Sequence, residues 1–345
     1  MKAAVLKKIN DMEYMEVDTP TIGEQDLLVK MKAASICGTD MRIYRGRKTK
    51  GVRYPSIIGH EFSGEVVQVG NKVDTFSVGD KICINNVLSC GRCYYCLNNM
   101  ENVCENREAI GYEYDGAFAE YVRVPGKFIS RGNIMKMPDS ISWEAGALIE
   151  PLSCVINGQR KLNITPGDTV VVIGAGPIGL MHIMLAKVAG AKTVVVSEPN
   201  ELRRTQSLEF GADIVVDPAK ESLSVIIKDI THDLGADVVI VAIGIPSLVD
   251  EALALGRKGA HVSLFAGFPA GSKFEIDGNL IHYNELTVVG ASALQRRDMI
   301  TSLNLIESKT IDVEKLITHT YSLDSIIEAF EKAESGEAIK VIIKG

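Results

Sequence analysis

The 345-residue sequence lacks the features that would assign it at once to several classes of protein. It has no run of about 18 apolar residues without a charged or turn-forming residue, so we expect no membrane-spanning helix. It has no excess of basic residues, because 37 Lys and Arg stand against 44 Asp and Glu and give a net charge of −7. A general affinity for nucleic acid or for an anionic membrane surface is therefore not expected. The N-terminal residues contain no uninterrupted apolar segment of signal-peptide length, which favours a cytoplasmic protein.

The length and the order of the apolar segments predict two domains of different kinds. A chain of 345 residues is about twice as long as a usual domain. Residues 1–150 contain short β-like runs separated by Gly and Pro, which favours an all-β, barrel-like unit. Residues 167–200 instead read as a buried strand, a Gly-rich turn, a helix and a second buried strand, and further strands alternate with helical segments through residue 267. This alternation predicts an α/β fold with a parallel, doubly wound sheet.

Four of the seven cysteines lie within the segment CGRCYYCLNNMENVC. Thiols stay reduced in the cytoplasm, where clustered cysteines are more often metal ligands than disulfides. Cys90, Cys93, Cys96 and Cys104 have the spacing C-x2-C-x2-C-x7-C, and four thiolates complete the tetrahedral shell of a zinc ion. Iron–sulfur sites also use closely spaced cysteines, but their usual spacings differ. Because four thiolates leave no position for a substrate, the predicted zinc site is structural, and a catalytic metal would lie elsewhere.

A dinucleotide-binding motif follows the strand TVVVI. Gly174, Gly176 and Gly179 fit G-x-G-x-x-G and open a helix, which is the context that the motif requires. The glycines allow a tight turn, a close approach of the backbone to the pyrophosphate, and close packing of helix on strand. Glu198 ends the next strand, where a carboxylate can bind the ribose hydroxyls and repel a 2′-phosphate, so NAD is favoured over NADP. Arg203 could cover the adenine and leaves some use of NADP open.

Three further segments contain residues of the kinds that bind zinc. SICGTD contains Cys37 and Thr39, GHEF contains His60 and Glu61, and ALIEPLSC contains Glu150. Each has an ordinary interpretation, such as a small core residue, a hydrogen-bonded loop histidine or a charge at a helix start. Together they offer one thiolate, one imidazole and two carboxylates, a set suited to an open zinc site with room for substrate.

These motifs, in this order, resemble those of the zinc-dependent medium-chain dehydrogenases, most closely the sorbitol (polyol) and threonine dehydrogenase branch. The resemblance extends over essentially the full length and rests on CGTD, GHEFSGEVVQVG, the four-cysteine segment, DGAFAEYV, IEPLSC and VIGAGPIGL. It implies a GroES-like β-barrel catalytic domain formed by residues 1–152 and 291–345, with a structural zinc lobe at about residues 88–106. A Rossmann NAD-binding domain of residues 153–290 would be inserted between them, and the active site would lie in the cleft.

The resemblance also implies roles for the zinc-binding candidates. Cys37, His60 and Glu150 match the catalytic zinc ligands, and Glu61 matches a carboxylate that ligates zinc or approaches it transiently. A glutamate at Glu150, where alcohol branches have cysteine, resembles the polyol branch. Two zinc ions per chain are expected. Zinc would lower the pKa of the substrate hydroxyl, a hydride would pass to C4 of the nicotinamide, and Thr39 would receive the proton. The expected cofactor contacts also include Pro177, Ile178, Ala242, Phe265, Ala266, Gly267, Ala291 and Ser292.

The sequence departs from the branch at Arg42. Related polyol and threonine dehydrogenases often have histidine at this position as a proton relay, and arginine cannot shuttle protons at neutral pH. The relay would then run through the ribose hydroxyls and water, or Arg42 would bind another group. Arg42 also begins RIYRGRKTKGVR, which has six basic residues and no acid. This segment is either a solvated loop or a funnel for an anionic substrate, such as a polyol phosphate or a hydroxy acid.

The sequence therefore predicts a cytoplasmic oxidoreductase that transfers a hydride from a sorbitol-like polyol or another secondary alcohol to NAD and gives the ketone. L-Threonine 3-dehydrogenase, polyol-phosphate dehydrogenase and 2,3-butanediol dehydrogenase are alternatives within the class. The alternatives from other classes are a zinc-free quinone reductase-like protein, a nucleotide-binding relative without activity and a zinc-ribbon nucleic-acid binder. The expected partner is a small-molecule substrate, with no nucleic acid and no membrane, and we expect a homotetramer or homodimer.

Overall fold

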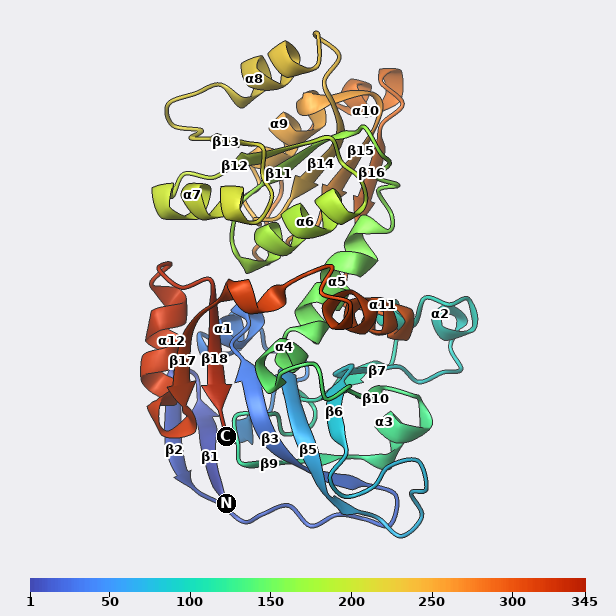
Figure 1. The fold of residues 1–345 in the computed structure, drawn as a ribbon, viewed down its shortest axis with the longest axis vertical. Helices are drawn as coiled ribbons and strands as arrows, with labels where there is room; N and C mark the ends of the chain where they lie inside the picture. Colours follow the sequence, from blue (N-terminus) through green and yellow to red (C-terminus); the bar gives the residue numbers. More distant parts are fainter. The chain divides into compact units, whose positions relative to one another are not determined.

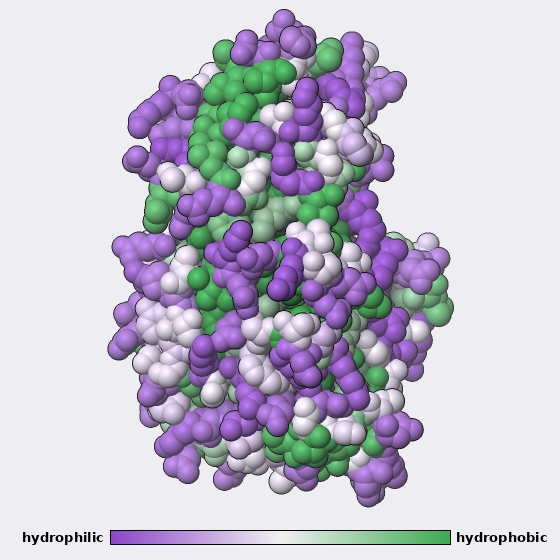
Figure 2. Space-filling model, viewed as in Figure 1, coloured by the Kyte–Doolittle hydropathy of each residue, from purple (hydrophilic) through white to green (hydrophobic).

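The computed structural model describes all 345 residues, which form two compact units. The discontinuous unit contains residues 1–153 and 293–345, and the inserted unit contains residues 154–292. None of the helices combines the length and the apolar character needed to span a lipid bilayer. Figure 2 shows one face of the molecule, on which hydrophilic residues predominate and apolar residues form separate patches.

A seven-stranded sheet is the main sheet of the discontinuous unit (Figure 1). Its order is β10-β6-β5-β3-β18-β17, and β9 also pairs with β3. The last strand of the chain, β18, runs antiparallel to β3 with Ile342 opposite Ser35, so both ends of the chain contribute to one sheet. The strands are β3 (Leu27–Ser35), β5 (Glu61–Val69), β6 (Lys81–Ile84), β9 (Tyr121–Val124), β10 (Ile134–Lys136), β17 (Ile317–Ser322) and β18 (Lys340–Lys344).

Two smaller sheets and a set of short helices complete this unit. The three-stranded sheet has the order β2-β1-β4 and contains β1 (Lys2–Lys8), β2 (Asp11–Glu16) and β4 (Ser56–Ile57). β7 (Val87–Leu88) pairs with β8 (Glu108–Ala109). The helices are α1 (Gly38–Tyr44), α2 (Tyr94–Leu97), α3 (Gly126–Ser130), α4 (Trp143–Ala147), α11 (Arg296–Glu307) and α12 (Ile326–Glu334). Single 3-10 turns are η1 (Glu101–Val103), η2 (Val313–Leu316) and η3 (Leu323–Ser325). The core between these elements includes fully buried Leu6, Met31 and Phe118.

A parallel six-stranded sheet forms the inserted unit and confirms the predicted doubly wound α/β fold. Its order is β13-β12-β11-β14-β15-β16. In Figure 1, α6 and α7 lie on one face of this sheet, while α9 and α10 lie on the other. The strands are β11 (Thr169–Ile173), β12 (Thr193–Ser197), β13 (Ile214–Val216), β14 (Ala236–Val241), β15 (Gly256–Leu264) and β16 (Thr287–Gly290). The helices are α6 (Pro177–Val188), α7 (Glu201–Glu209), α8 (Leu223–Ile230), α9 (Leu248–Leu255) and α10 (Gly278–Tyr283), and α5 (Ile149–Gln159) ends in this unit.

The valine runs of β11 and β12 suit their position in the interior of this sheet. Val170, Val171 and Val172 of β11 are fully buried, as are the valines of β12. Helices cover both faces of a doubly wound sheet, so its middle strands have no solvent-facing side and are apolar throughout. The β-branched side chains also suit an extended backbone.

His182 in α6 is a histidine with no exposed surface. Its Nδ1 lies 3.1 Å from the Nε2 of Gln159, and its ring meets the ring of Phe265 edge-on with centroids 4.5 Å apart. Its Nε2 has no hydrogen-bond partner within the chain. Burial lowers the pKa of His182 to about 3, because a charged imidazolium would lose its hydration there.

We expect His182 to make the stability of the protein depend on pH in the acid range. The unfolded chain protonates this side chain below about pH 6.5, whereas the folded chain does so only near pH 3. The free energy of unfolding therefore falls as the pH drops below 6.5, with a contribution of about 2 kcal/mol at pH 5. His182→Gln lacks this contribution, so its Tm should fall less between pH 7 and pH 5 than that of the wild type. An equal fall in the two proteins would contradict this account.

Candidate active site and metal centres

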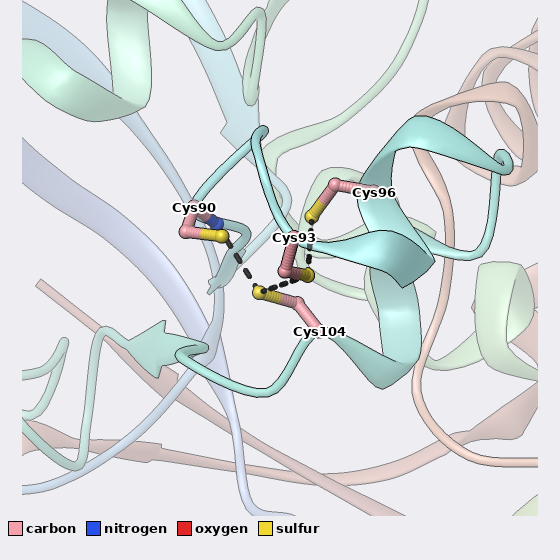
Figure 3. Close-up of side chains that lie close together, drawn as sticks. All are labelled: Cys90, Cys93, Cys96 and Cys104. Atoms are coloured by element: carbon pink, nitrogen blue, oxygen red, sulfur yellow. Dashed lines mark hydrogen bonds between the residues drawn. The ribbon is translucent and has the colours of Figure 1, made fainter.

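Four cysteine sulfurs converge between β7 and β8 (Figure 3). They belong to Cys90, Cys93, Cys96 and Cys104, and all four sulfur atoms lie within 4.8 Å of one another. Cys93 Sγ is 3.5 Å from Cys96 Sγ and 3.7 Å from Cys104 Sγ. Sulfurs bound tetrahedrally at a Zn–S distance of about 2.3 Å would be about 3.8 Å apart, whereas a disulfide needs about 2.05 Å. The four-cysteine group therefore fits a closed tetrahedral metal shell, and none of its thiols forms a disulfide.

Backbone amides of the same segment favour the thiolate form of two of these cysteines. The Arg92 backbone N–H, followed by that of Cys93, lowers the pKa of Cys90 to about 6. The backbone N–H groups of Cys96 and Glu105 lower the pKa of Cys93. The thiolate is the form of cysteine that binds metal. The backbone of this segment therefore favours the charged form of Cys90 and Cys93 that would bind a metal cation.

The four-cysteine segment is attached to the start of α11. Gln295, the N-cap of α11, donates from its Nε2 to Asn102 Oδ1 at 2.9 Å. Arg296 forms an ion pair with Glu101 at 3.0 Å. These contacts join parts of the chain that are far apart in sequence, so the folding of the cysteine segment supports the position of α11.

A second group of metal-binding side chains lies where β3 ends and β5 begins. Cys37 caps α1 directly after β3, His60 precedes β5, and Glu61 is the first residue of β5. One ligand atom of each of these residues lies within 4.8 Å of the other two. The cause is strand register, because β3 and β5 are antiparallel neighbours in which Ser35 pairs with Glu61. His60 and Glu61 are buried, while Cys37 remains partly exposed.

Asp40 orients two members of this group. Its Oδ1 lies 3.0 Å from His60 Nδ1, and its Oδ2 accepts a hydrogen bond from the Cys37 backbone N–H at 3.0 Å. With Nδ1 engaged by a fully buried carboxylate, the other ring nitrogen of His60 is left for a metal. The sequence analysis gave Asp40 no role. Its position three residues after the N-cap was nevertheless a signal for a side chain that binds the cap backbone.

Glu61 is held by a lysine from the other end of the chain. Lys340 Nζ and the Ser35 hydroxyl both donate to Glu61 Oε2, and both charged side chains are almost fully buried. Burial acts to raise the pKa of Glu61, but the Lys340 ammonium and then His60 outweigh it and leave the pKa below its usual value. Glu61 is therefore a carboxylate whose second oxygen can face a metal. No sequence pattern pointed to Lys340.

Glu150 does not belong to this group of three ligand atoms. Glu150, in the first turn of α5, is only 7% exposed, and burial raises its pKa to about 7. His60 and Glu61 are among the charges that act on it, so it belongs to the same electrostatic environment. Thr39 is a half-buried residue of α1 whose hydroxyl makes no hydrogen bond within the chain.

The Gly-rich turn of the inserted unit has the geometry of a phosphate cradle. Gly174 has a φ of +97°, which favours glycine, and a Cβ on Gly179 would lie 2.0 Å from the Gly174 carbonyl oxygen. Gly176 caps α6, and a Cβ built on it would meet no atom within 4 Å. Open space in front of a helix N-terminus is where the pyrophosphate of a dinucleotide binds. The turn fits the predicted cofactor.

Glu198, the residue directly after β12, fixes this turn. Its Oε2 accepts a hydrogen bond from the Ala175 backbone N–H at 2.8 Å, and its Oε1 accepts one from the Asn200 backbone N–H at 2.9 Å. The side chain is 5% exposed. Two backbone amides therefore hold a buried negative charge beside the Gly-rich turn, and each oxygen retains a lone pair for a ribose hydroxyl.

The other residues predicted to contact the cofactor lie along the same edge of the sheet. Ala242 follows β14, residues 265–267 follow β15, and residues 291–292 follow β16. The strand order reverses between β11 and β14, and doubly wound sheets bind ligands at such a point. Pro177 and Ile178 begin α6, and Arg203 lies in the first turn of α7.

The basic segment 42–53 is partly neutralised. Arg45 pairs with Glu334, and Arg53 pairs with Asp115 at 2.9 Å. Both acids come from distant parts of the sequence, which is why the segment alone suggested a larger charge excess. The cations without an acidic partner are Arg42, Arg47, Lys48 and Lys50.

Known proteins resemble this chain over its whole length. Residues 23–139 match the family described as alcohol dehydrogenase GroES-like domain, and residues 177–308 match zinc-binding dehydrogenase. The chain is 38% identical to the L-threonine 3-dehydrogenase of Pyrococcus furiosus over 96% of this chain and 94% of that protein. It is 31% identical to the sorbitol dehydrogenase of Bacillus subtilis over 99% and 97% of the two chains. The structure of a presumed zinc-binding dehydrogenase of Sinorhizobium meliloti 1021, solved with NADP, matches this chain with a TM-score of 0.92 and 32% sequence identity. The match covers 100% of this chain and 99% of that chain.

The same substitution should have different effects in the two metal-binding groups. Cys93→Ser removes a ligand from the closed four-cysteine group, so we expect one zinc fewer per chain and a Tm lower by about 5 °C or more. Cys37→Ser changes the second group, so we expect catalytic activity to fall about a hundredfold or more with little change in Tm. Zinc content, Tm and turnover of both variants check this. A destabilised Cys37→Ser beside a fully stable Cys93→Ser would reverse the two assignments.

Proposed function

The chain belongs to the zinc-dependent medium-chain dehydrogenase family, and on this basis we propose that it oxidises a secondary alcohol or polyol to the ketone with NAD. Membership makes the protein an oxidoreductase that uses zinc and a nicotinamide dinucleotide. The preference for a polyol among alcohols rests on Glu150 and on the 31% identity to a sorbitol dehydrogenase. The preference for NAD over NADP rests on Glu198.

One observation carries the proposal: Cys37, His60 and Glu61 form a ligand group distinct from the four cysteines. Thiolate, imidazole and carboxylate are all zinc ligands, and they are the mixed donors found in zinc sites that keep a position for substrate. We assign them to a catalytic zinc, with Glu150 as a further ligand, and the four cysteines to a structural zinc. Bound zinc supplies a Lewis acid that lowers the pKa of the substrate hydroxyl, and bound nicotinamide supplies the hydride acceptor.

The residues around this group have separate tasks in the proposal. Asp40 keeps the ring of His60 in one orientation and one tautomer, since its carboxylate binds Nδ1 at 3.0 Å. Lys340 and Ser35 hold Glu61 from behind. Thr39, two residues after Cys37, has an unengaged hydroxyl, and we assign it to receive the substrate proton. Arg42 cannot take that proton further, because its guanidinium group stays protonated at neutral pH.

Three further assignments concern the domains, the oligomeric state and the location of the protein. We assign residues 1–152 and 291–345 to the catalytic domain and residues 153–290 to NAD binding, in keeping with the two compact units. We propose a homodimer or homotetramer, because β16 is an edge strand of its sheet and Tyr283 nearby is 72% exposed. We propose a cytoplasmic location, because all seven cysteines are free and four of them fit a metal.

L-Threonine oxidation is the second candidate activity. It is favoured by the 38% identity to an L-threonine 3-dehydrogenase over nearly the full length of both proteins. L-Threonine is also a secondary alcohol, so the same ligand group and the same cofactor would serve. The two candidates differ only in the side chains that contact the rest of the substrate.

A substrate screen with the zinc-loaded protein tests the proposed function. Reduction of NAD is followed by absorbance with sorbitol, polyol phosphates, 2,3-butanediol and L-threonine. We expect at least one of these alcohols to be oxidised, two zinc ions per chain, and loss of activity with a chelator that zinc restores. Reduction of a quinone without oxidation of any alcohol, and without any effect of metal removal, would refute the proposal.

The choice of NAD can be tested at Glu198. Removing the carboxylate in Glu198→Ala should lower the ratio of kcat/KM with NAD to that with NADP by about ten- to hundredfold, since the clash of charges is worth about 1–3 kcal/mol. Glu198→Gln is the matched control for charge, because an amide oxygen can still accept one of the two backbone hydrogen bonds. We expect Glu198→Gln to change the ratio in the same direction with a smaller loss of Tm. A wild type that prefers NADP would refute the assignment.

A further inference from the structure

Lys48 lies on the ring of Tyr112, next to the proposed catalytic zinc group. Lys48 Nζ is 4.1 Å from the centroid of the Tyr112 ring. The same ring lies 5.4 Å from the ring of His60, centroid to centroid. Tyr112 therefore stands between an ammonium group and a proposed zinc ligand.

The ammonium of Lys48 is only partly satisfied by the chain. Lys48 is half-buried, and its one hydrogen bond goes to the Lys50 carbonyl oxygen at 2.8 Å. No carboxylate pairs with it, although an ammonium has three N–H donors. The Tyr112 hydroxyl likewise makes no hydrogen bond within the chain. Two polar groups beside the zinc group are therefore free to bind a ligand.

The charges around Lys48 favour an anion. Burial lowers the pKa of Lys48, and nearby Arg107, Arg42 and Lys50 act in the same direction. Glu113 is an acid that acts on Lys48 in the opposite direction, and its Oε2 already accepts a hydrogen bond from the Ala109 backbone N–H at 2.8 Å. Bringing four cations together costs free energy, which a bound anion would offset.

Lys48 differs from the other cations of the basic segment. Arg45 and Arg53 are paired with acids, and Arg42, Arg47 and Lys50 are exposed residues whose charge is screened by water and salt. A half-buried ammonium is screened less, and its hydrogen bond to an anion is correspondingly stronger. The alternative is a purely packing role, in which Lys48 only contacts the face of Tyr112.

We propose that Lys48, supported on Tyr112, binds an anionic group of the substrate while the substrate hydroxyl lies at Cys37, His60 and Glu61. The anionic group is a carboxylate or a phosphate. The proposal rests on the proposed alcohol oxidation and narrows its substrate to hydroxy acids or alcohol phosphates. Lys48 is thereby a specificity-determining residue of the same site.

The test compares matched neutral and anionic alcohols in wild type and variants. The pairs are 2-butanol with 3-hydroxybutyrate, for a carboxylate, and sorbitol with sorbitol 6-phosphate, for a phosphate. Lys48→Met keeps the length of the side chain and removes its charge. We expect kcat/KM for the preferred anionic alcohol to fall about ten- to hundredfold, as for loss of a charged hydrogen bond, with the neutral partner changed less than about twofold. Lys48→Arg should restore most of the loss.

Lys50→Met is the matched control, since it removes an exposed charge two residues away and keeps the carbonyl that binds Lys48. We expect Lys50→Met to change kcat/KM for the anionic substrate by less than about threefold, and we expect added salt to abolish this change. The proposal is overturned if the wild type prefers the neutral alcohol of both pairs. It is also overturned if Lys48→Met lowers kcat/KM equally for the neutral and the anionic alcohol. In both cases the proposed alcohol oxidation still stands. If the protein oxidises none of these four alcohols and none of the alcohols in the substrate screen, the proposed function itself is refuted.

Discussion

The buried ion pair between Glu61 and Lys340 is the contact on which the proposed catalytic group depends. Moving a carboxylate or an ammonium out of water costs several kcal/mol, so neither side chain is stable there without the other. β18 brings Lys340 beside β3, and β3 brings Ser35 beside Glu61 of β5. Three strands in register thus bring one lysine, one hydroxyl and one carboxylate together. The last strand of the chain must join the sheet before the group is complete.

The two metal-binding groups are built in different ways. The four cysteines come from one short segment, and its own backbone amides favour the thiolate form of Cys90 and Cys93. Cys37, His60 and Glu61 come from the ends of two strands and are oriented by Asp40 and Lys340. The first group is closed by four sulfurs and suits a structural role. The second mixes three kinds of donor and suits chemistry, since a mixed, partly exposed set leaves space for a substrate.

The residues that we propose to determine specificity lie in loops beside the strands of the main sheet. Lys48 lies in the loop after α1 and Tyr112 in the loop after β8, whereas Cys37, His60 and Glu61 lie at or beside the ends of β3 and β5. Strand ends keep a metal geometry constant, and loops can change without disturbing the core. Relatives named for threonine and for sorbitol share this fold with the present chain. On our proposal, substrate choice depends on a few loop side chains, and Lys48 is the half-buried cation of the basic segment that has no acidic partner.

Local patterns in the sequence determined the parts of this protein that neighbouring residues specify. The valine runs and the turn from Gly174 to Gly179 predicted the parallel sheet, and the cysteine spacing predicted a closed metal shell, because each depends on residues close together in the chain. Tertiary structure alone decided the partner of Glu61, the second task of Glu198 at Ala175, and the pairing of Arg45 with Glu334. These contacts join residues brought together by strand register and by the packing of distant segments. A single sequence does not record that register, since any of several lysines or acids could have filled the same position.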